Sequence, residues 1–295
     1  MSAAVSVRDL RLTVGRRAVL DNLSLHLAGG RIYGLIGRNG SGRSSLMSVL
    51  AGLRRPDSGS VRIGGMPVFE NEAAAGAVCL VRGRFHFPEE LGRVRDALRF
   101  AAALRPGWDT DYARHLTERF RMDVDRRIRA LSEGERAAVG VIAGLASRAP
   151  VTLFDEAHAV MDVPARHLFY DELLADCTAH PRTVIVSTHL LEELGSVFEE
   201  VVMIDAGKLV ARGETEALRA QGCQVTGPAD LVDFFVQGLQ VLDERLLGRT
   251  KSAVVFGELD ADRHARAGAM NLDLAPIGLQ DLFGHLIRDT GEGRR

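Results

Sequence analysis

The sequence has very little lysine and almost no net charge. Of its 37 basic residues only Lys208 and Lys251 are lysines, so nearly every cation is an arginine. The formal net charge is −2, which argues against nucleic acid as a partner, because neutralising phosphates needs a basic surface. The apolar share of 46% and the charged share of 26% are instead those of an ordinary globular protein.

Cysteine pairs and long apolar runs are also missing. Cys79, Cys177 and Cys223 are scattered without CxxC spacing, which predicts buried free thiols in a reducing compartment. The N-terminal segment lacks the apolar core of a signal peptide, and no run approaches the roughly 18 apolar residues that a membrane helix needs. We therefore expect a soluble, cytoplasmic protein, in which any membrane-spanning part belongs to another chain.

The expected elements follow the order of an α/β fold. Segments 5–14 and 18–27 predict an antiparallel hairpin, and a buried strand at 31–37 precedes a helix at 44–53. Helical spacing dominates from about residue 83 to 149. The later segments are buried strands at 151–155 and 183–188, a helix between them, and a hairpin around Gly207. We expect a first domain at 1–221 that carries a helical insert at about 83–149.

Residues 222–295 form a second expected domain. Their segments can be read in the order β-α-β-β-α-β-α, which is typical of a small α+β unit of the ferredoxin-like kind. This unit contains no metal cluster and no obvious catalytic group. Support of a dimer, regulation and a passive cap on the core all remain open as its role.

The segment GRNGSGRSS joins the buried strand at 31–37 to the following helix and has the composition of a phosphate-binding loop. Its glycines let backbone N–H groups surround a phosphate, and the start of the helix favours negative charge there. Ser44 stands where a hydroxyl would hold Mg²⁺. The residues expected to bind phosphate are Gly37, Arg38, Asn39, Gly40, Ser41, Gly42, Arg43, Ser44 and Ser45.

Three further motifs carry polar groups at the ends of expected elements. VTLFDE ends a buried strand with Asp155, which suits Mg²⁺, and Glu156, which suits activation of a water. LSEGE opens a helix at Ser132, and a capping box is a complete structural explanation for it. STH places His189 after another buried strand, where a histidine is usually structural or solvated.

In this order and spacing the motifs resemble the ATP-binding cassette of ABC transporters, over about residues 5–220. GRNGSGRSS looks like its Walker A motif, LSEGE its signature, VTLFDE its Walker B motif, AHAVMD its D-loop ending at Asp162, and STH its switch histidine. The signature lies about twenty residues before the Walker B motif, a hallmark of that family. The resemblance implies a P-loop ATPase core with an antiparallel β subdomain and an inserted α-helical subdomain.

The resemblance also implies a working cycle. In that family two cassettes dimerise head to tail with ATP between them, and hydrolysis drives the membrane subunits. Ser44 and Asp155 would hold Mg²⁺, and Glu156 and His189 would be catalytic. The residues implied to face ATP bound by the partner are Ser132, Glu133, Gly134 and Glu135. The implied cofactors are ATP and Mg²⁺, and the implied partners are a second cassette and separate transmembrane permease subunits, which would receive the protein at the inner face of the membrane. A segment of the helical insert would receive the permease's coupling helix.

Several positions depart from that family's pattern. Arg43 stands where Walker A has lysine, and a planar guanidinium would be displaced from the place of a compact ammonium. Arg82 falls near the place of the Q-loop glutamine, although a solvated surface arginine explains it equally well. Val14 stands where an aromatic side chain usually stacks on adenine, and Arg16 or Arg17 is an alternative. Glu133 replaces a signature glycine, and the D-loop has Ala157, Ala159 and Val160 in place of its usual residues.

Two functional hypotheses follow from this mixture. In the first, the chain is an energising ATPase of an exporter, favoured by the intact Glu156 and His189. In the second, it binds nucleotide, hydrolyses poorly and pairs with a standard cassette, favoured by Arg43 and Arg82. Chromosome or translation factors with the same cassette are disfavoured, because the chain has neither coiled-coil arms nor a second cassette.

Overall fold

The computed structural model describes residues 2–83, 92–188 and 197–292, and its contacts divide the chain into two compact units. The first unit covers the described residues up to 209 and the second covers those from 210 onward. Each unit is described by itself. None of the helices in the described ranges is long and apolar enough to cross a lipid bilayer.

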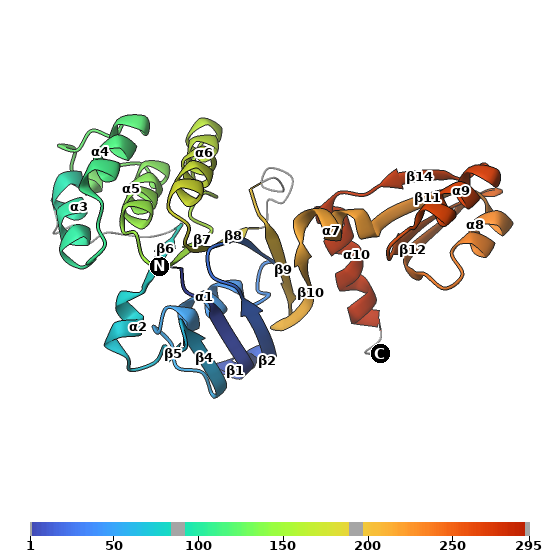
Figure 1. Ribbon diagram of the computed structural model, residues 1–295, viewed down its shortest axis with the longest axis horizontal. Helices are drawn as coiled ribbons and strands as arrows, with labels where there is room; N and C mark the ends of the chain where they lie inside the picture. The colour runs from blue at the N-terminus through green and yellow to red at the C-terminus, as the bar shows by residue number, and fades with distance from the viewer. Residues whose placement is uncertain (1, 84–91, 189–196, 293–295) are drawn as a thin grey trace. The chain divides into compact units, whose positions relative to one another are not determined.

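An antiparallel sheet begins the first unit (Figure 1), with strand order β2-β1-β4-β5. Its strands are β1 (Val5–Val14), β2 (Arg17–Leu27), β4 (Ser58–Ile63) and β5 (Met66–Pro67). The expected hairpin is confirmed, with Val14 opposite Arg17. An irregularity at Asp9, with φ of 49°, moves the buried positions of β1 from Val7 to Leu10, so one face stays apolar along the whole strand.

Strands β9, β3, β8, β7 and β6 lie in this spatial order in the sheet at the centre of the first unit. Their bounds are β3 (Ile32–Ile36), β6 (Val78–Arg82), β7 (Val151–Asp155), β8 (Thr183–Thr188) and β9 (Glu200–Asp205). Strand β10 (Lys208–Glu214) follows β9 along the chain, and all but its first two residues belong to the second unit. Strands β3, β7 and β8 are buried at every position, as continuous apolar runs in a parallel sheet should be. Because β3, β6, β7 and β8 run parallel, their carboxyl ends meet at one edge, where ligands bind in open α/β sheets.

Helices of the first unit pack against the strands of these sheets. Helix α1 (Arg43–Leu50) contacts β2 of the antiparallel sheet and β6 and β7 of the parallel one. The expected helix at 44–53 ends earlier because Gly52 turns the chain with a φ of +70°. The remaining helices of the first unit are α2 (Glu72–Gly76), α3 (Val94–Ala103), α4 (Thr110–Arg119), the short 3₁₀ helix Ile128–Ala130, α5 (Glu133–Ala146) and α6 (Val163–Ala179).

Helices α3, α4 and α5 gather beside β6 and β7 (Figure 1), with α5 packed directly on both strands. A Cβ at Gly144 of α5 would lie 2.6 Å from Val81 of β6, so only glycine permits this approach.

A buried ionic cluster links α6 to the segments that flank it in space. Asp176 of α6 pairs with Arg148 and Arg182, and Arg148 reaches Asp109 at 2.9 Å.

The second unit confirms the expected β-α-β-β-α-β-α order. Its elements are α7 (Thr215–Gln221), β11 (Gly222–Pro228), α8 (Ala229–Phe235), β12 (Gln240–Leu247), β13 (Thr250–Phe256), α9 (Ala261–Ala269), β14 (Asp273–Pro276) and α10 (Leu279–Glu292). The sheet order is β12-β13-β11-β14 and every pairing is antiparallel, which matches a ferredoxin-like unit. Val225, Ala253 and Val255 of the sheet pack with Val232 and Phe235 of α8 in a separate core.

Of the three cysteines, Cys79 and Cys223 are buried free thiols, as expected. Cys177 corrects the expectation, because it is only partly buried on α6. Burial nevertheless raises the pKa of the Cys177 thiol to about 11, so it stays protonated at neutral pH.

Candidate nucleotide-binding site

The loop between β3 and α1 has the backbone of a phosphate cradle. Gly40 and Gly42 adopt φ of +82° and +108°, a region that favours glycine. A Cβ at Gly42 would lie 2.5 Å from the carbonyl oxygen of Val19, and one at Gly37 would lie 2.3 Å from Ser41 Oγ. Ser41 Oγ is itself buried, and no residue within 2–83, 92–188 or 197–292 gives it a hydrogen bond. A buried hydroxyl without a partner in a glycine-wound loop fits a bound phosphate.

The mouth of this loop is an open hollow of about 500 Å³. It is lined by Arg17, Arg38, Asn39, Gly40, Ser41, Asp205 and Ala206. Val14, the position expected to contact adenine, is 43% exposed at the end of β1. Arg17 lines the hollow, whereas Val14 is not among its lining residues, so the arginine is the better placed of the two to contact a base.

Helix α1 and strand β7 meet at a cluster of oxygen atoms suited to Mg²⁺. Ser44 Oγ donates a hydrogen bond to Asp155 Oδ1 at 3.0 Å, and Ser187 Oγ of β8 donates to the same oxygen at 2.8 Å. Mg²⁺ prefers such oxygen ligands and completes its shell with phosphates and water. Ser44 and Asp155 therefore fit the metal as expected. Ser187 was missed from sequence, and its signal is a hydroxyl in the buried run of the adjacent strand.

Next to this cluster, Arg43 forms an ion pair with Glu156. Arg43 Nη2 donates to Glu156 Oε1 at 2.6 Å, and the exposed fractions of the two side chains are 6% and 34%. The other terminal nitrogen, Nη1, is buried and has no hydrogen-bond partner in the part of the chain that the structure describes. Both residues were expected in the site, but their direct contact was not. The arginine at the lysine position thus engages the carboxylate expected to activate water.

The backbone of Glu156 is held independently of its side chain. Its φ is 51°, unusual for a residue other than glycine, and its N–H donates to Ser187 Oγ at 3.1 Å. Gly83 lies against it so closely that a Cβ there would be 2.3 Å from the Glu156 carbonyl oxygen. The position of the Glu156 backbone therefore does not depend on which partner its carboxylate contacts.

Arg82 ends β6 opposite Asp155 in the parallel register. Its Nη2 donates to Ser48 Oγ on α1 at 2.9 Å. Ser48 follows Ser44 by one helical turn, and its hydroxyl donates to the Ser44 carbonyl at 2.7 Å. Arg82 therefore lies beside the site and is hydrogen-bonded to α1. Its assignment to the Q-loop stays a prediction.

The signature segment opens α5 with the expected capping box. Ser132 Oγ accepts a hydrogen bond from the Glu135 N–H at 3.2 Å, and the Glu135 carboxylate accepts one from the Ser132 N–H at 2.8 Å. Arg126 also contacts Glu135. Burial raises the pKa of the Glu135 carboxyl, but the Ser132 N–H and the Arg126 guanidinium outweigh it and hold the pKa below its usual value.

Two further residues of the signature segment, Glu133 and Gly134, lie between Ser132 and Glu135. Glu133 is the first residue of α5, and Gly134 follows it. A Cβ at Gly134 would lie 2.9 Å from the Val160 carbonyl oxygen, so the start of α5 rests on the D-loop of the same chain. The contact of these residues with a partner's nucleotide stays a prediction.

The D-loop contributes a cap and a buried histidine. Asp162 accepts a hydrogen bond from the Ala165 N–H at 2.9 Å and so caps α6. His158 is fully buried, its Nε2 lies 3.0 Å from Thr188 Oγ1, and its ring stacks on Phe169. His158 was not expected from the sequence to take part in this loop. His189, expected to be catalytic, lies outside the described residues.

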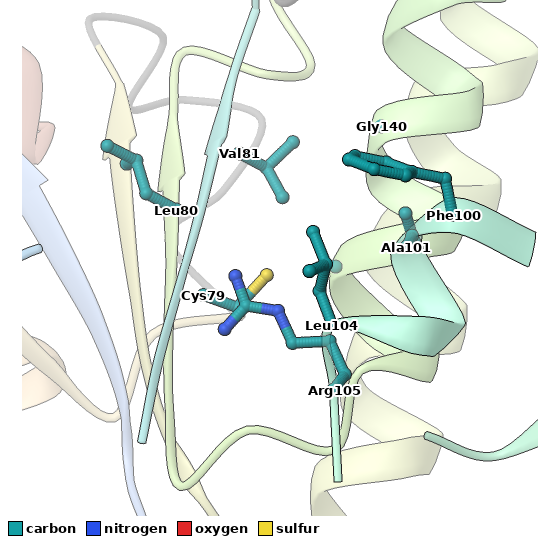
Figure 2. A pocket seen from close by; sticks show the side chains of 10 residues that line it. Cys79, Leu80, Val81, Phe100, Ala101, Leu104, Arg105 and Gly140 are labelled. Carbon is teal, nitrogen blue, oxygen red and sulfur yellow. The ribbon is translucent and has the colours of Figure 1, made fainter. Parts of the chain in front are cut away.

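A second cavity of about 130 Å³ lies between β6 and helices α3 and α5. Figure 2 shows Phe100, Leu104 and Arg105 on the helical side facing the strand that carries Cys79 and Val81. Arg105 Nη1 donates to the Val78 carbonyl at 2.6 Å and so fixes the end of α3 to β6. Phe100 and Leu104 are 47% and 60% exposed, which leaves an apolar rim on this cavity.

Comparisons with known proteins agree with this geometry. The ABC transporter family profile matches residues 20–159. The Daunorubicin resistance ATP-binding protein DrrA3 of Streptomyces coeruleorubidus is 30% identical over 99% of this chain and 97% of its own length. The Nod factor export ATP-binding protein I of Paraburkholderia xenovorans (strain LB400) is 28% identical over 98% and 97%.

Solved structures show the same fold. The ATP-binding subunit of an ABC transporter aligns with a TM-score of 0.67 at 22% identity, over 74% of this chain and 92% of that one. A dimeric ATP-binding cassette bound to ADP and Pi aligns with a TM-score of 0.64 at 17% identity, over 72% and 98%. With its glycine loop, its Ser44–Asp155 contact and a full-length relative at 30% identity, the chain belongs to the ATP-binding subunits of ABC transporters.

Proposed function

We propose that the chain binds Mg²⁺-ATP at its glycine loop and energises export through separate membrane subunits. The observation that carries the proposal is the contact of Ser44 with Asp155, which unites the loop, the helix start and the Walker B strand at one edge of the sheet. The direction of transport is taken from a relative named as an export ATP-binding protein. Residues 1–221 are then the cassette and residues 222–295 a smaller accessory domain.

In the proposed reaction Glu156 accepts a proton from water. The water oxygen bonds to the γ-phosphorus, the bond from that phosphorus to the β,γ-bridging oxygen breaks, and ADP and inorganic phosphate leave. When bound, Mg²⁺ neutralises charge on the phosphates and holds them in position. Ser44 and Asp155 hold the metal, the loop N–H groups hold the phosphates, and His189 assists at the γ-phosphate.

A second cassette completes the site in this proposal. Two chains meet head to tail, so that Ser132 and Gly134 of each contact ATP bound by the other. Ser132 Oγ accepts the hydrogen bond that caps its own helix, and its O–H can still donate one to a phosphate oxygen. The helix start adds a positive dipole end.

The membrane subunits are proposed to dock on the helical insert and to hold the protein at the inner face of the membrane. The cavity of Figure 2 supports this, because Phe100 and Leu104 expose apolar surface at its rim. Exposed apolar groups around a hollow are typical of interaction sites.

The alternative function is a nucleotide-binding cassette that hydrolyses poorly and pairs with a standard one. The Arg43–Glu156 ion pair favours it, because it occupies an oxygen of the general base. In that arrangement Ser132 and Gly134 serve the partner's site while this chain's own site acts as a clamp.

Steady-state Mg²⁺-ATP hydrolysis and ADP binding by the purified protein test both readings. For the first function, Glu156→Gln lowers turnover on the order of 100-fold or more while ADP still binds, because only the proton acceptor is lost. Glu118→Gln, on an exposed position of α4, is the matched control and leaves turnover unchanged. Background turnover with intact binding selects the alternative, and a failure to bind ADP or ATP refutes both.

A further inference from the structure

We propose that Arg43 is an autoinhibitory latch that holds Glu156 and a nucleotide phosphate with the two ends of one guanidinium group. This inference rests on the proposed function of the same site. It specifies how binding and hydrolysis are coupled: the protein retains nucleotide while the general base stays engaged, and turnover waits for Glu156 to be released.

Arg43 is buried and paired through one end of its guanidinium group. Its side chain is 6% exposed, so its charge is almost entirely removed from water. A buried cation is tolerated when it is paired, and the pair here is Nη2 with Glu156 Oε1 at 2.6 Å. The carboxylate is about one-third exposed and keeps a path to other partners.

The other terminal nitrogen of Arg43, Nη1, is buried. It has no hydrogen-bond partner among the described residues, which is costly for a charged group. Arg43 is also the first residue of α1, directly after the glycine loop that fits a phosphate. A phosphate oxygen would supply the missing acceptor. Because the guanidinium is a rigid plane, Nη2 can keep Glu156 while Nη1 binds the phosphate.

The shape of the arginine side chain distinguishes this position from one occupied by lysine. Lysine offers one compact ammonium, whereas arginine presents donors in a fixed fork that can serve two anions. With arginine, the carboxylate and the phosphate share one cation. The backbone of Glu156 is already fixed by Ser187 and by the close approach of Gly83, so release requires rotation of its side chain alone.

The first test is a double-mutant cycle on Mg²⁺-ADP binding, where no hydrolysis intervenes. Glu156→Gln leaves the whole charge of Arg43 to the phosphate, and we expect ADP to bind about tenfold more tightly. Arg43→Met keeps a long stem without charge. In that background Glu156→Gln should change ADP affinity less than about twofold, because no cation remains to be shared.

The second test is turnover of the full-length protein. Arg43→Lys should raise the rate of Mg²⁺-ATP hydrolysis about tenfold, since one ammonium cannot hold both anions. Arg54→Lys, at an exposed position just after α1, is the matched control and should leave the rate unchanged. Circular dichroism and melting temperature establish that each variant is folded.

The outcomes separate the latch from the proposed function. If the native protein binds ADP but Glu156→Gln changes the ADP affinity less than twofold, the proposal that Glu156 and a phosphate share Arg43 is wrong. An Arg43→Lys variant that turns over no faster than the native protein also overturns the latch. If neither the native protein nor Arg43→Lys binds any nucleotide, the proposed function itself fails.

Discussion

The start of α1 and the start of α5 both present polar groups at a helix N-terminus, yet they are satisfied in opposite ways. At α5, Ser132 and Glu135 satisfy each other, and Arg126 completes the cap. At α1, Ser41 Oγ and Arg43 Nη1 are buried, and neither has a hydrogen-bond partner among the residues that the structure describes. Buried polar groups without partners are costly unless a ligand meets them, which favours the glycine loop as the proposed nucleotide site of this chain.

The signature segment and the glycine loop also differ in what they contribute in the absence of a ligand. The signature segment is a self-sufficient helix cap that stabilises the fold with or without a partner. The glycine loop is closely packed, and its buried polar groups lack hydrogen-bond partners among the described residues. Substitutions at α1 should therefore affect binding most, and substitutions at α5 should affect stability.

The largest expected effect is that of Gly42→Ala. The new Cβ meets the Val19 carbonyl at 2.5 Å and stands at a φ of +108°, so the loop must move. We expect a loss of about 2–3 kcal/mol in the free energy of unfolding, measured by urea denaturation. ADP affinity should fall by at least about tenfold.

Gly65→Ala is the control for Gly42→Ala. Gly65 has a similar positive φ of +82° in a turn, but no atom lies within 4 Å of its added Cβ. The conformational cost alone should be about 1 kcal/mol. If both variants lose the same stability and both keep ADP, close packing of the loop does not decide binding.

An intermediate effect is expected for Ser132→Ala. The variant loses the side-chain cap of α5, which should cost about 1 kcal/mol in the free energy of unfolding. ADP binding by the isolated protein should not change, because the cap is not part of the chain's own loop. Ser132→Thr keeps the hydroxyl and should retain most of the stability. A drop in ADP affinity for Ser132→Ala would contradict the contrast between the two helix starts.

The smallest effect concerns the pH dependence of Glu135. Its pKa is lower in the folded protein than its ordinary value of 4.5, so its charged form stabilises the fold. That contribution is present above pH 4.5 and is lost as the pH falls through the lower, folded-state pKa. Because the group is partly exposed, we expect no more than about 0.5 kcal/mol.

Glu135→Gln measures this contribution. Urea denaturation of the native and variant proteins at pH 7 and at successively lower pH should show a gap that narrows below pH 4.5. A gap that stays constant over that range would mean that Arg126 and the Ser132 N–H act equally on the amide. The charge of Glu135 would then contribute nothing to the free energy of unfolding.

The order of elements was predictable because hydrophobic periodicity is local. The hairpin of β1 and β2, the buried strands β3, β7 and β8, and the β-α-β-β-α-β-α order of the second unit were all expected and are all present. Local turn chemistry was harder: the end of α1 depends on the positive φ of Gly52, and the expected helix ran past it.

Sequence by itself determined which chemical groups the site contains. Ser44, Asp155 and Glu156 were recognisable because their motifs stand at fixed distances along the chain. Tertiary structure alone decided which of these side chains contact one another. Ser187 reaches Asp155, and Arg43 pairs with Glu156 across 113 residues of sequence, because parallel strands bring their carboxyl ends to one edge. Spacing along a chain specifies the groups, but the packing of α1 against β7 specifies their partners.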